Sequence, residues 1–338
     1  MGEFDLIERY FKRPERAAAR AALVPLGIGD DCALLQPRPG TQIAISSDML
    51  VEGRHFLSTV NPAALGHKAL AVNLSDLAAC GAQPLAFTLA LALPQADEAW
   101  LAPFSQGLLA LADAHGCELI GGDTTRGPLN ICITVLGEVP MIDGKSQALL
   151  RSGAKAGDDI YASGTLGDAR LALEVFRGTV EVPPDVFARA RLRMERPTPR
   201  VALGLALRGI ATAAIDVSDG LLGDLGHILK ASGVGARIEL AKATDLIADI
   251  ARSIWAISQF DSQFSEKLCL EYALAGGDDY ELAFTAPPAV REAVERAAAQ
   301  GAVRVTRIGQ IEASHGLRLV NAQGASVSNT FGSFDHFA

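Results

Sequence analysis

Residues 118–125 read Glu-Leu-Ile-Gly-Gly-Asp-Thr-Thr, and their pattern is the clearest indication of the fold class. Its first three residues are typical of a short strand, and a glycine pair and an aspartate follow at once. The same design, a strand-like run that passes into a small polar turn, recurs along the chain between helical segments. Strands that alternate with helices indicate an α/β protein.

Across the rest of the chain, the alternation of strands and helices is irregular. The apolar patterns predict helices at 4–24, 61–80, 100–115, from 168 onward and at 221–232. They predict strands at 42–45, 85–93, 118–120, 130–139, 160–163, 211–216 and 281–285. Irregular alternation favours mixed (α+β) sheets over one regular doubly wound sheet. The pairs Pro183-Pro184 and Pro197-Thr198-Pro199 are interpreted as linkers.

The chain has 338 residues, enough for two domains of ordinary size. Residues 140–159 are rich in turn-forming residues, and this stretch is the predicted boundary. We therefore expect one domain over residues 1–147 and a second α/β domain over residues 148–338.

Charge and cysteine content exclude several classes of function. The net charge of -9, with no basic run, argues against binding nucleic acid. Five cysteines, an odd number without a C-x-x-C pair, indicate reduced thiols and argue against a zinc site. Residues 1–20 lack the apolar core of a signal peptide, and no apolar stretch is long enough to span a bilayer. The expected location is the cytoplasm, without membrane contact.

The aspartates supply the functional signal. Five strand-like runs end in a polar turn that carries Asp, and these turns lie at 29–31, 46–48, 122–124, 216–220 and 277–279. A sixth site, Asp76, lies within a predicted apolar helix, with Asn73 on the same face. Asp and Gly are also the commonest turn residues, so each motif alone is more often an ordinary turn. The six together favour a shared magnesium site, because oxygen ligands suit Mg²⁺ and the ions would join an acidic chain to a polyphosphate.

Three further features remain ambiguous on their own. Gly164-Thr165-Leu166-Gly167 opens a helix and could bind a phosphate, but it lacks the Lys of a Walker A loop and is equally a tight turn. Arg151 could clamp a phosphate or be a solvated surface residue. His55 follows an Asp-bearing segment and could be a ligand or a structural histidine.

Taken in order, these segments resemble the thiamine-monophosphate kinase family of the aminoimidazole ribonucleotide synthetase-like superfamily. The resemblance covers nearly the whole chain, and the matching stretches are 27–33 (GIGDDCA), 46–56 (SSDMLVEGRHF), 71–79 (AVNLSDLAA), 119–125 (LIGGDTT), 151–154 (RSGA), 215–221 (IDVSDGL), 276–282 (GGDDYEL) and 334–337 (FDHF).

The resemblance implies two α/β domains, with the N-terminal one binding ATP and magnesium and joining two subunits as a homodimer. It implies a transferase of thiamine biosynthesis that moves the ATP γ-phosphate directly to thiamine monophosphate, with Asp48, Asp76 and Asp123 central to catalysis. By motif match the metal ligands would be Asp30, Ser46, Ser47, Asp48, Asp76, Asp123, Asp216 and Asp219. ATP would meet Gly122, Asp123, Arg151 and Ser218, and the thiamine phosphate would meet His55, Asp278 and Phe334.

Three positions depart from the family pattern. The family usually has Glu at the position of Asp278, Gly at that of Ser333 and often an aromatic Tyr at that of His115, which puts adenine packing there in doubt. Two alternatives stay open at this point. One is another ATP-using member of the superfamily, such as an aminoimidazole ribonucleotide or selenophosphate synthetase. The other is a nucleotide-binding protein without turnover.

Overall fold

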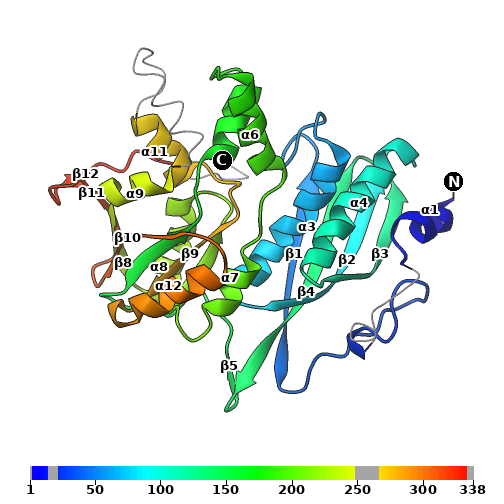
Figure 1. Ribbon diagram of the computed structural model, residues 1–338, viewed down its shortest axis with the longest axis horizontal. Helices are drawn as coiled ribbons and strands as arrows, with labels where there is room; N and C mark the ends of the chain where they lie inside the picture. Colours follow the sequence, from blue (N-terminus) through cyan, green and yellow to red (C-terminus); the bar gives the residue numbers. More distant parts are fainter. Residues whose placement is uncertain (1, 14–21, 248–265, 333–338) are drawn as a thin grey trace. The chain divides into compact units, whose positions relative to one another are not determined.

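The computed structural model describes residues 2–13, 22–247 and 266–332. Contacts between residues divide the chain into two units, one of Met1–Leu77 with Ala82–Ala148 and one of Ala78–Gly81 with Leu149–Ala338. Each unit contains a mixed sheet and helices, so the predicted mixed α/β class is confirmed (Figure 1). In the described part of the chain, no helix is both long and apolar enough to cross a membrane.

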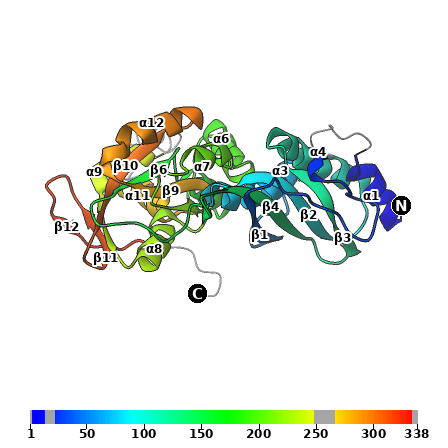
Figure 2. The ribbon, with the colours of Figure 1, turned by 90° about the horizontal axis from the view of Figure 1, so that it is seen from below.

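The sheet of the first unit has the spatial order β1-β4-β2-β3, and β5 pairs with the C-terminal end of β4. Neighbouring strands are antiparallel except for β2 and β3, which are parallel and connected by α4. Helices α3 and α4 lie against one face of this sheet (Figures 1 and 2). The elements are α1 (Glu3–Tyr10), β1 (Thr41–Val51), α3 (Pro62–Ala79), β2 (Gln83–Leu93), α4 (Glu98–Ala114), β3 (Glu118–Arg126), β4 (Asn130–Ile142) and β5 (Lys145–Ser146).

The two faces of this sheet differ in character. Phe87 of β2 and Phe104 of α4 are fully buried in the core between sheet and helices. On β1 successive side chains point to opposite faces, so Leu50 is buried while Ile45 and Met49 are 65% and 53% exposed. In the described part of this unit, the face away from the helices therefore exposes apolar side chains.

The second unit is built on a seven-stranded sheet in the order β12-β11-β8-β10-β6-β9-β7. Strands β6 and β9 and the edge strand β7 are buried along their whole length, which agrees with their apolar sequences. The strands are β6 (Asp159–Ser163), β7 (Ala213–Val217), β8 (Gly235–Glu239), β9 (Glu281–Ala286), β10 (Val305–Glu312), β11 (Gly316–Val320) and β12 (Ser326–Val327). The α-helices are α5 (Asp168–Phe176), α6 (Pro184–Glu195), α7 (Val201–Ala206), α8 (Leu221–Ser232), α9 (Leu240–Ala243), α11 (Glu266–Ala275) and α12 (Arg291–Gln300).

Several predicted boundaries need correction. The helix expected over 4–24 ends at Tyr10. Pro184 is the first residue of α6 and not part of a linker, since proline suits the first helical turn. The segments 46–48 and 122–124 lie inside β1 and β3, where they were expected to be turns. Their polar side chains fit a strand because each contacts a helix, a neighbouring strand or solvent.

Candidate functional site

Strand β1 and helix α3 bring four polar residues of the first unit together. The Ser46 hydroxyl donates to the carboxylate of Asp76. The side-chain oxygen of Asn73 accepts the backbone N–H of Asp48 at 3.1 Å, while its amide donates to the Ala69 carbonyl at 3.0 Å. Asn73 is 1% exposed, so these bonds satisfy a buried polar group. The expectation that Asn73 and Asp76 share a face of the helix is confirmed.

The neighbouring hydroxyl, Ser47, points to the opposite face of the sheet. It lies 2.9 Å from the Thr134 hydroxyl and donates to the Ile133 carbonyl at 3.2 Å, both on β4. Ser46 and Ser47 therefore present oxygen atoms on two different faces of β1.

Gly122 and Asp123 lie on the other edge strand, β3. A Cβ at Gly122 would lie 1.9 Å from the Leu89 carbonyl, and the φ of Gly122 is +142°, so this close approach of β3 to β2 requires glycine. Asp123 is exposed, and it lines an open hollow of about 420 Å³ on the helix-free face. Met49, Ala90 and Cys132 line the same hollow, one from each of the other three long strands.

The sheet register keeps Asp48 and Asp123 apart within one chain. Asp48 pairs with Ile133, which pairs with Leu89, which pairs with Gly122. Three strand spacings, roughly 14 Å, therefore separate the two edge positions. Asp48 also shares the helix-facing side of the sheet with Leu50, whereas Asp123 lies on the opposite side.

The predicted convergence of carboxylates is not found inside either unit. Over residues 2–13, 22–247 and 266–332, no three His, Cys, Asp or Glu side chains gather into a group that could hold a metal ion. Asp30 is exposed, and its carboxylate accepts the backbone N–H of Asp31 at 2.8 Å. Within the first unit, Asp48 and Asp123 stay apart because they lie on the two edge strands and on opposite faces of one sheet. The convergence of the predicted aspartates from both units stays a prediction. The metal ligands themselves stay a prediction.

His55 lies in the turn that follows β1. Its Nδ1 accepts the backbone N–H of Val51 at 3.0 Å. Acceptance at Nδ1 places the proton of the neutral ring on Nε2. His115, at the end of α4, has its pKa lowered by burial and by the nearby His67, so its ring is neutral near pH 7.

In the second unit, the turn 218–220 joins β7 to α8. Asp224, in the first turn of α8, accepts the backbone N–H groups of Ser218, Asp219 and Gly220 at 3.0, 3.1 and 3.2 Å. Burial, followed by the charge of Asp219, raises the pKa of Asp224 to about 6, although the three N–H bonds lower it. Asp216, at 6% exposure, belongs to β7 just before this turn.

The turn at 276–280 packs directly against that one. The Asp278 N–H donates to the Ser218 carbonyl at 2.7 Å, and the Tyr280 N–H donates to the Val217 carbonyl at 2.9 Å. Ser218, Asp219 and Asp278 are therefore brought together. Phe334, the remaining predicted contact with the thiamine phosphate, lies outside the described residues, as does Ser333.

Arg151 lies at the other end of β7. The Ala214 N–H donates to the Leu150 carbonyl at 2.9 Å, whereas Ser218 follows the last residue of the strand. Four residues of strand, about 13 Å, separate these two positions. The second unit thus does not bring the two predicted ATP contacts Arg151 and Ser218 side by side.

The Gly164–Gly167 turn is not available as a simple phosphate loop. The N–H of Gly167 donates to both carboxylate oxygens of Asp279, at 3.1 and 3.2 Å. The N–H of Gly164 donates to the Arg304 carbonyl, and that of Leu166 to the Leu246 carbonyl. The alternative, a tight turn from strand to helix, is the one that the structure supports.

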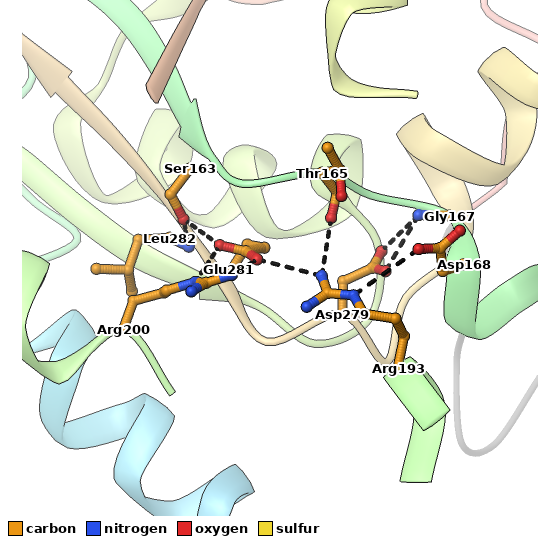
Figure 3. Close-up of polar contacts among 9 residues, drawn as sticks. All are labelled: Ser163, Thr165, Gly167, Asp168, Arg193, Arg200, Asp279, Glu281 and Leu282. Atoms are coloured by element: carbon orange, nitrogen blue, oxygen red, sulfur yellow. Dashed lines mark hydrogen bonds and ion pairs between the residues drawn. The ribbon is translucent and has the colours of Figure 1, made fainter. Parts of the chain in front are cut away.

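Sequence reasoning missed a buried ionic cluster behind this turn (Figure 3). Glu281 accepts hydrogen bonds from Ser163, Arg193 and Arg200, and Arg193 also lies near Asp168. The arginines and Glu281 are more than eighty residues apart in the chain, and no local pattern links them. The stretch 276–282 was singled out for Asp278, but nothing in it indicates that Asp279 and Glu281 are buried.

Comparison with known proteins identifies the family. The chain is 47% identical over 342 residues to thiamine-monophosphate kinase of Salmonella typhimurium, and the match covers 100% of this chain and 98% of that protein. The chain belongs to the thiamine-monophosphate kinase family. Family models described as AIR synthase related protein, N-terminal domain and C-terminal domain, match residues 29–139 and 155–321.

Solved structures of this kinase family agree. The chain resembles the thiamine-monophosphate kinase of Stenotrophomonas maltophilia with a TM-score of 0.81 and 44% identity, covering 97% of this chain and 98% of that one. It also resembles AaThiL complexed with AMPPCP and TMP, with a TM-score of 0.73 and 28% identity over 89% of each chain. The resemblance stated from the sequence motifs is therefore confirmed.

Proposed function

We propose that this protein is an ATP-dependent kinase that converts thiamine monophosphate to thiamine diphosphate and ADP. The full-length match to thiamine-monophosphate kinases is the observation that carries this conclusion. A structural relative that holds both AMPPCP and TMP supports the same pair of ligands. The same match argues against another superfamily activity and against a binding protein without turnover. We place the reaction in the cytoplasm, in keeping with five cysteines that form no disulfide.

The reaction needs stabilisation of negative charge more than it needs proton transfer. The acceptor is a phosphate group that is already ionised near pH 7, so a strong general base is unnecessary. Both substrates and the chain itself are negatively charged, and the net charge of the chain is -9. Positioning and neutralisation of negative charge should therefore supply most of the rate enhancement. We expect direct transfer without a covalent enzyme intermediate.

Magnesium suits the donor set of the first unit. Ser46 and Asp76 already place a hydroxyl and a carboxylate in contact, and Asp48 is fixed nearby through Asn73. These are oxygen donors, which hard divalent cations prefer. When bound, the ions would offset the negative charge of the phosphates during transfer. The proposed ligands are Asp30, Ser46, Ser47, Asp48, Asp76, Asp123, Asp216 and Asp219.

Residues of the chain would hold the two substrates. Gly122, Asp123, Arg151 and Ser218 are the proposed ATP contacts. His55, Asp278 and Phe334 are the proposed contacts with thiamine monophosphate. His55 would donate from Nε2, since its Nδ1 is occupied by the backbone.

We propose further that two copies of the chain associate through the sheet of the first unit. Strands β1 and β3 are its edges, and exposed strand edges favour pairing with another strand. The helix-free face carries exposed Ile45 and Met49, which a second copy would cover. Pairing of β1 with β3 of the other copy would bring the edge that carries Asp48 of one chain next to the edge that carries Asp123 of the other, with the two side chains on opposite faces of the joined sheet.

A product assay tests the proposed function. The protein is incubated with ATP, MgCl₂ and thiamine monophosphate, and the thiamine compounds are separated by chromatography. We expect thiamine diphosphate, and no product when unphosphorylated thiamine replaces the monophosphate. Tight ATP binding without any phosphorylated product would support a regulatory nucleotide-binding protein and contradict the proposal.

A further inference from the structure

The turn that carries Asp278 adopts an unfavourable backbone conformation. Asp278 and Tyr280 have φ values of +63° and +53°, in the left-handed region that side chains other than glycine rarely adopt. Such backbone is strained in residues that carry a Cβ. Surrounding contacts must therefore hold the turn in place, and the residues that do so determine where the Asp278 side chain points.

Two buried carboxylates on either side of Tyr280 anchor this turn. Asp279 accepts the Gly167 N–H, as described above, and burial raises its pKa well above the usual range. Glu281 accepts the Ser163 hydroxyl at 2.5 Å and Nε of Arg200 at 2.6 Å. The turn is thus fixed at both ends to the Ser163–Asp168 segment and to Arg200 (Figure 3).

Arg193 of α6 links these anchors to one another. Its Nη2 donates to the Thr165 carbonyl and to Oε1 of Glu281, both at 3.3 Å. Its Nε lies 3.8 Å from Oδ2 of Asp168, and its charge lowers the pKa of Asp279. Arg193 therefore offsets negative charge from three buried carboxylates on two separate turns. Without it, the three carboxylates lose one of the positive charges that offset their mutual repulsion, while Glu281 keeps its bond to Arg200.

We infer that Arg193 is a positioning residue for acceptor binding: through Glu281 and the Gly164–Asp168 turn it fixes the strained turn that presents Asp278. This inference rests on the proposed function, in which Asp278 meets thiamine monophosphate. Arg193 is not itself a proposed contact with either substrate. It acts through the turn that carries Asp278.

The neighbouring turn at 218–220 has its own anchor. Asp224 holds its three N–H groups, and Asp224 has no contact with Arg193 among the described hydrogen bonds and ion pairs. Loosening the Asp278 turn should therefore affect the acceptor more than ATP. Replacing Asp224 with Ala should have the opposite selectivity, because Ser218 is a proposed ATP contact.

The test compares Arg193→Gln with Arg191→Gln. Arg191 lies on the same helix at a similar exposure, 30% against 27%, but its Nε donates to Glu195 at 2.7 Å on that helix. For Arg193→Gln we expect KM for thiamine monophosphate to rise about 10-fold, with kcat and KM for ATP within about threefold of wild type. Arg191→Gln should match wild type. Arg193→Lys, which keeps the charge but not the planar fork, should lie in between.

Each result separates this inference from the proposed function. If wild-type protein makes no thiamine diphosphate, the proposed function fails first. If wild type is active and Arg193→Gln leaves KM for thiamine monophosphate unchanged, or raises both KM values equally, the positioning role is wrong. Should Arg193→Gln fail to fold, as judged by its thermal unfolding, Arg193→Lys decides: a KM for thiamine monophosphate equal to that of wild type overturns the inference.

Discussion

Several buried side chains of this protein hold the backbone around the proposed site in place without being proposed ligands themselves. Asn73 binds the backbone of Asp48, Asp224 binds the backbone of Ser218–Gly220, and Asp279 binds that of Gly167. Each is buried, and each fixes the backbone at or beside a segment that carries a proposed ligand. Buried polar groups of this kind are costly when unpaired, so they define one backbone arrangement.

The titration of Asp224 gives a prediction at this scale. Its pKa rises from 3.8 to about 6 in the folded chain, because burial disfavours the charged form. Between about pH 4 and 6 the folded chain keeps a proton that the unfolded chain has released, so the free energy of unfolding falls as pH rises. The loss relative to Asp224→Asn should reach roughly 3 kcal/mol by pH 7.

Thermal unfolding of wild type and Asp224→Asn, measured in EDTA from pH 4 to 7, checks this. Asp185→Asn serves as the control, since the Asp185 side chain is 76% exposed and pairs with Arg189 on the surface. Parallel curves for wild type and Asp224→Asn across this range would show that burial does not shift the Asp224 titration.

Among the elements, β3 depends on one glycine for its place beside β2. A Cβ at Gly122 would meet the Leu89 carbonyl, whereas a Cβ at the adjacent Gly121 would meet nothing within 4 Å. Gly122→Ala should therefore cost on the order of 3 kcal/mol and displace Asp123, while Gly121→Ala should be nearly neutral. Chemical denaturation of both variants measures the difference. Equal free energies of unfolding for the two would contradict the tight packing of β3 on β2.

Element boundaries were predictable where local chemistry sets them. The Asn61 side chain caps α3 by accepting the Ala63 N–H, and Pro62 is the first residue of that helix. Helix α8 spans the predicted residues 221–232. Prediction failed where tertiary contacts decide. From the sequence, the polar residues 46–48 look like a turn; in the structure they lie in a strand, where Asp76 of α3 accepts a hydrogen bond from Ser46. Pro184 looks like part of a linker but is the first residue of α6.

For the candidate site, the sequence named candidate side chains but did not show how they are grouped. Aspartates beside glycines could be recognised along the chain, and the motif resemblance named the family correctly. Strand order could not be inferred from spacing, and it is strand order that puts Asp48 and Asp123 on opposite edges of one sheet. The link between Arg193 and Glu281 spans 88 residues and has no local signature.

At the scale of the whole molecule, the separation of Asp48 and Asp123 predicts that activity needs two copies. Asp48→Asn and Asp123→Asn should each fold and be nearly inactive alone. If each site takes Asp48 from one copy and Asp123 from the other, a mixed dimer keeps one intact site of its two. Random mixing of equal amounts should then restore about one quarter of wild-type activity.

The mixing experiment requires dissociation and reassociation of the subunits before the assay. Asp113→Asn provides the control, because Asp113 pairs with Arg13 on the surface and should stay active both alone and in mixtures. If mixed Asp48→Asn and Asp123→Asn remain as inactive as either variant alone, both residues act within one chain or the dimer is not the active form.

The proposed reaction passes the γ-phosphate of ATP to the phosphate of thiamine monophosphate. Phosphorus-31 NMR of one reaction containing protein, ATP, MgCl₂ and thiamine monophosphate follows every phosphorus atom at once. We expect the diphosphate signals of the thiamine product and of ADP to grow in equal amounts while the γ-phosphate signal disappears, and we expect EDTA to stop both changes. Release of inorganic phosphate with thiamine monophosphate unchanged would contradict the proposed reaction.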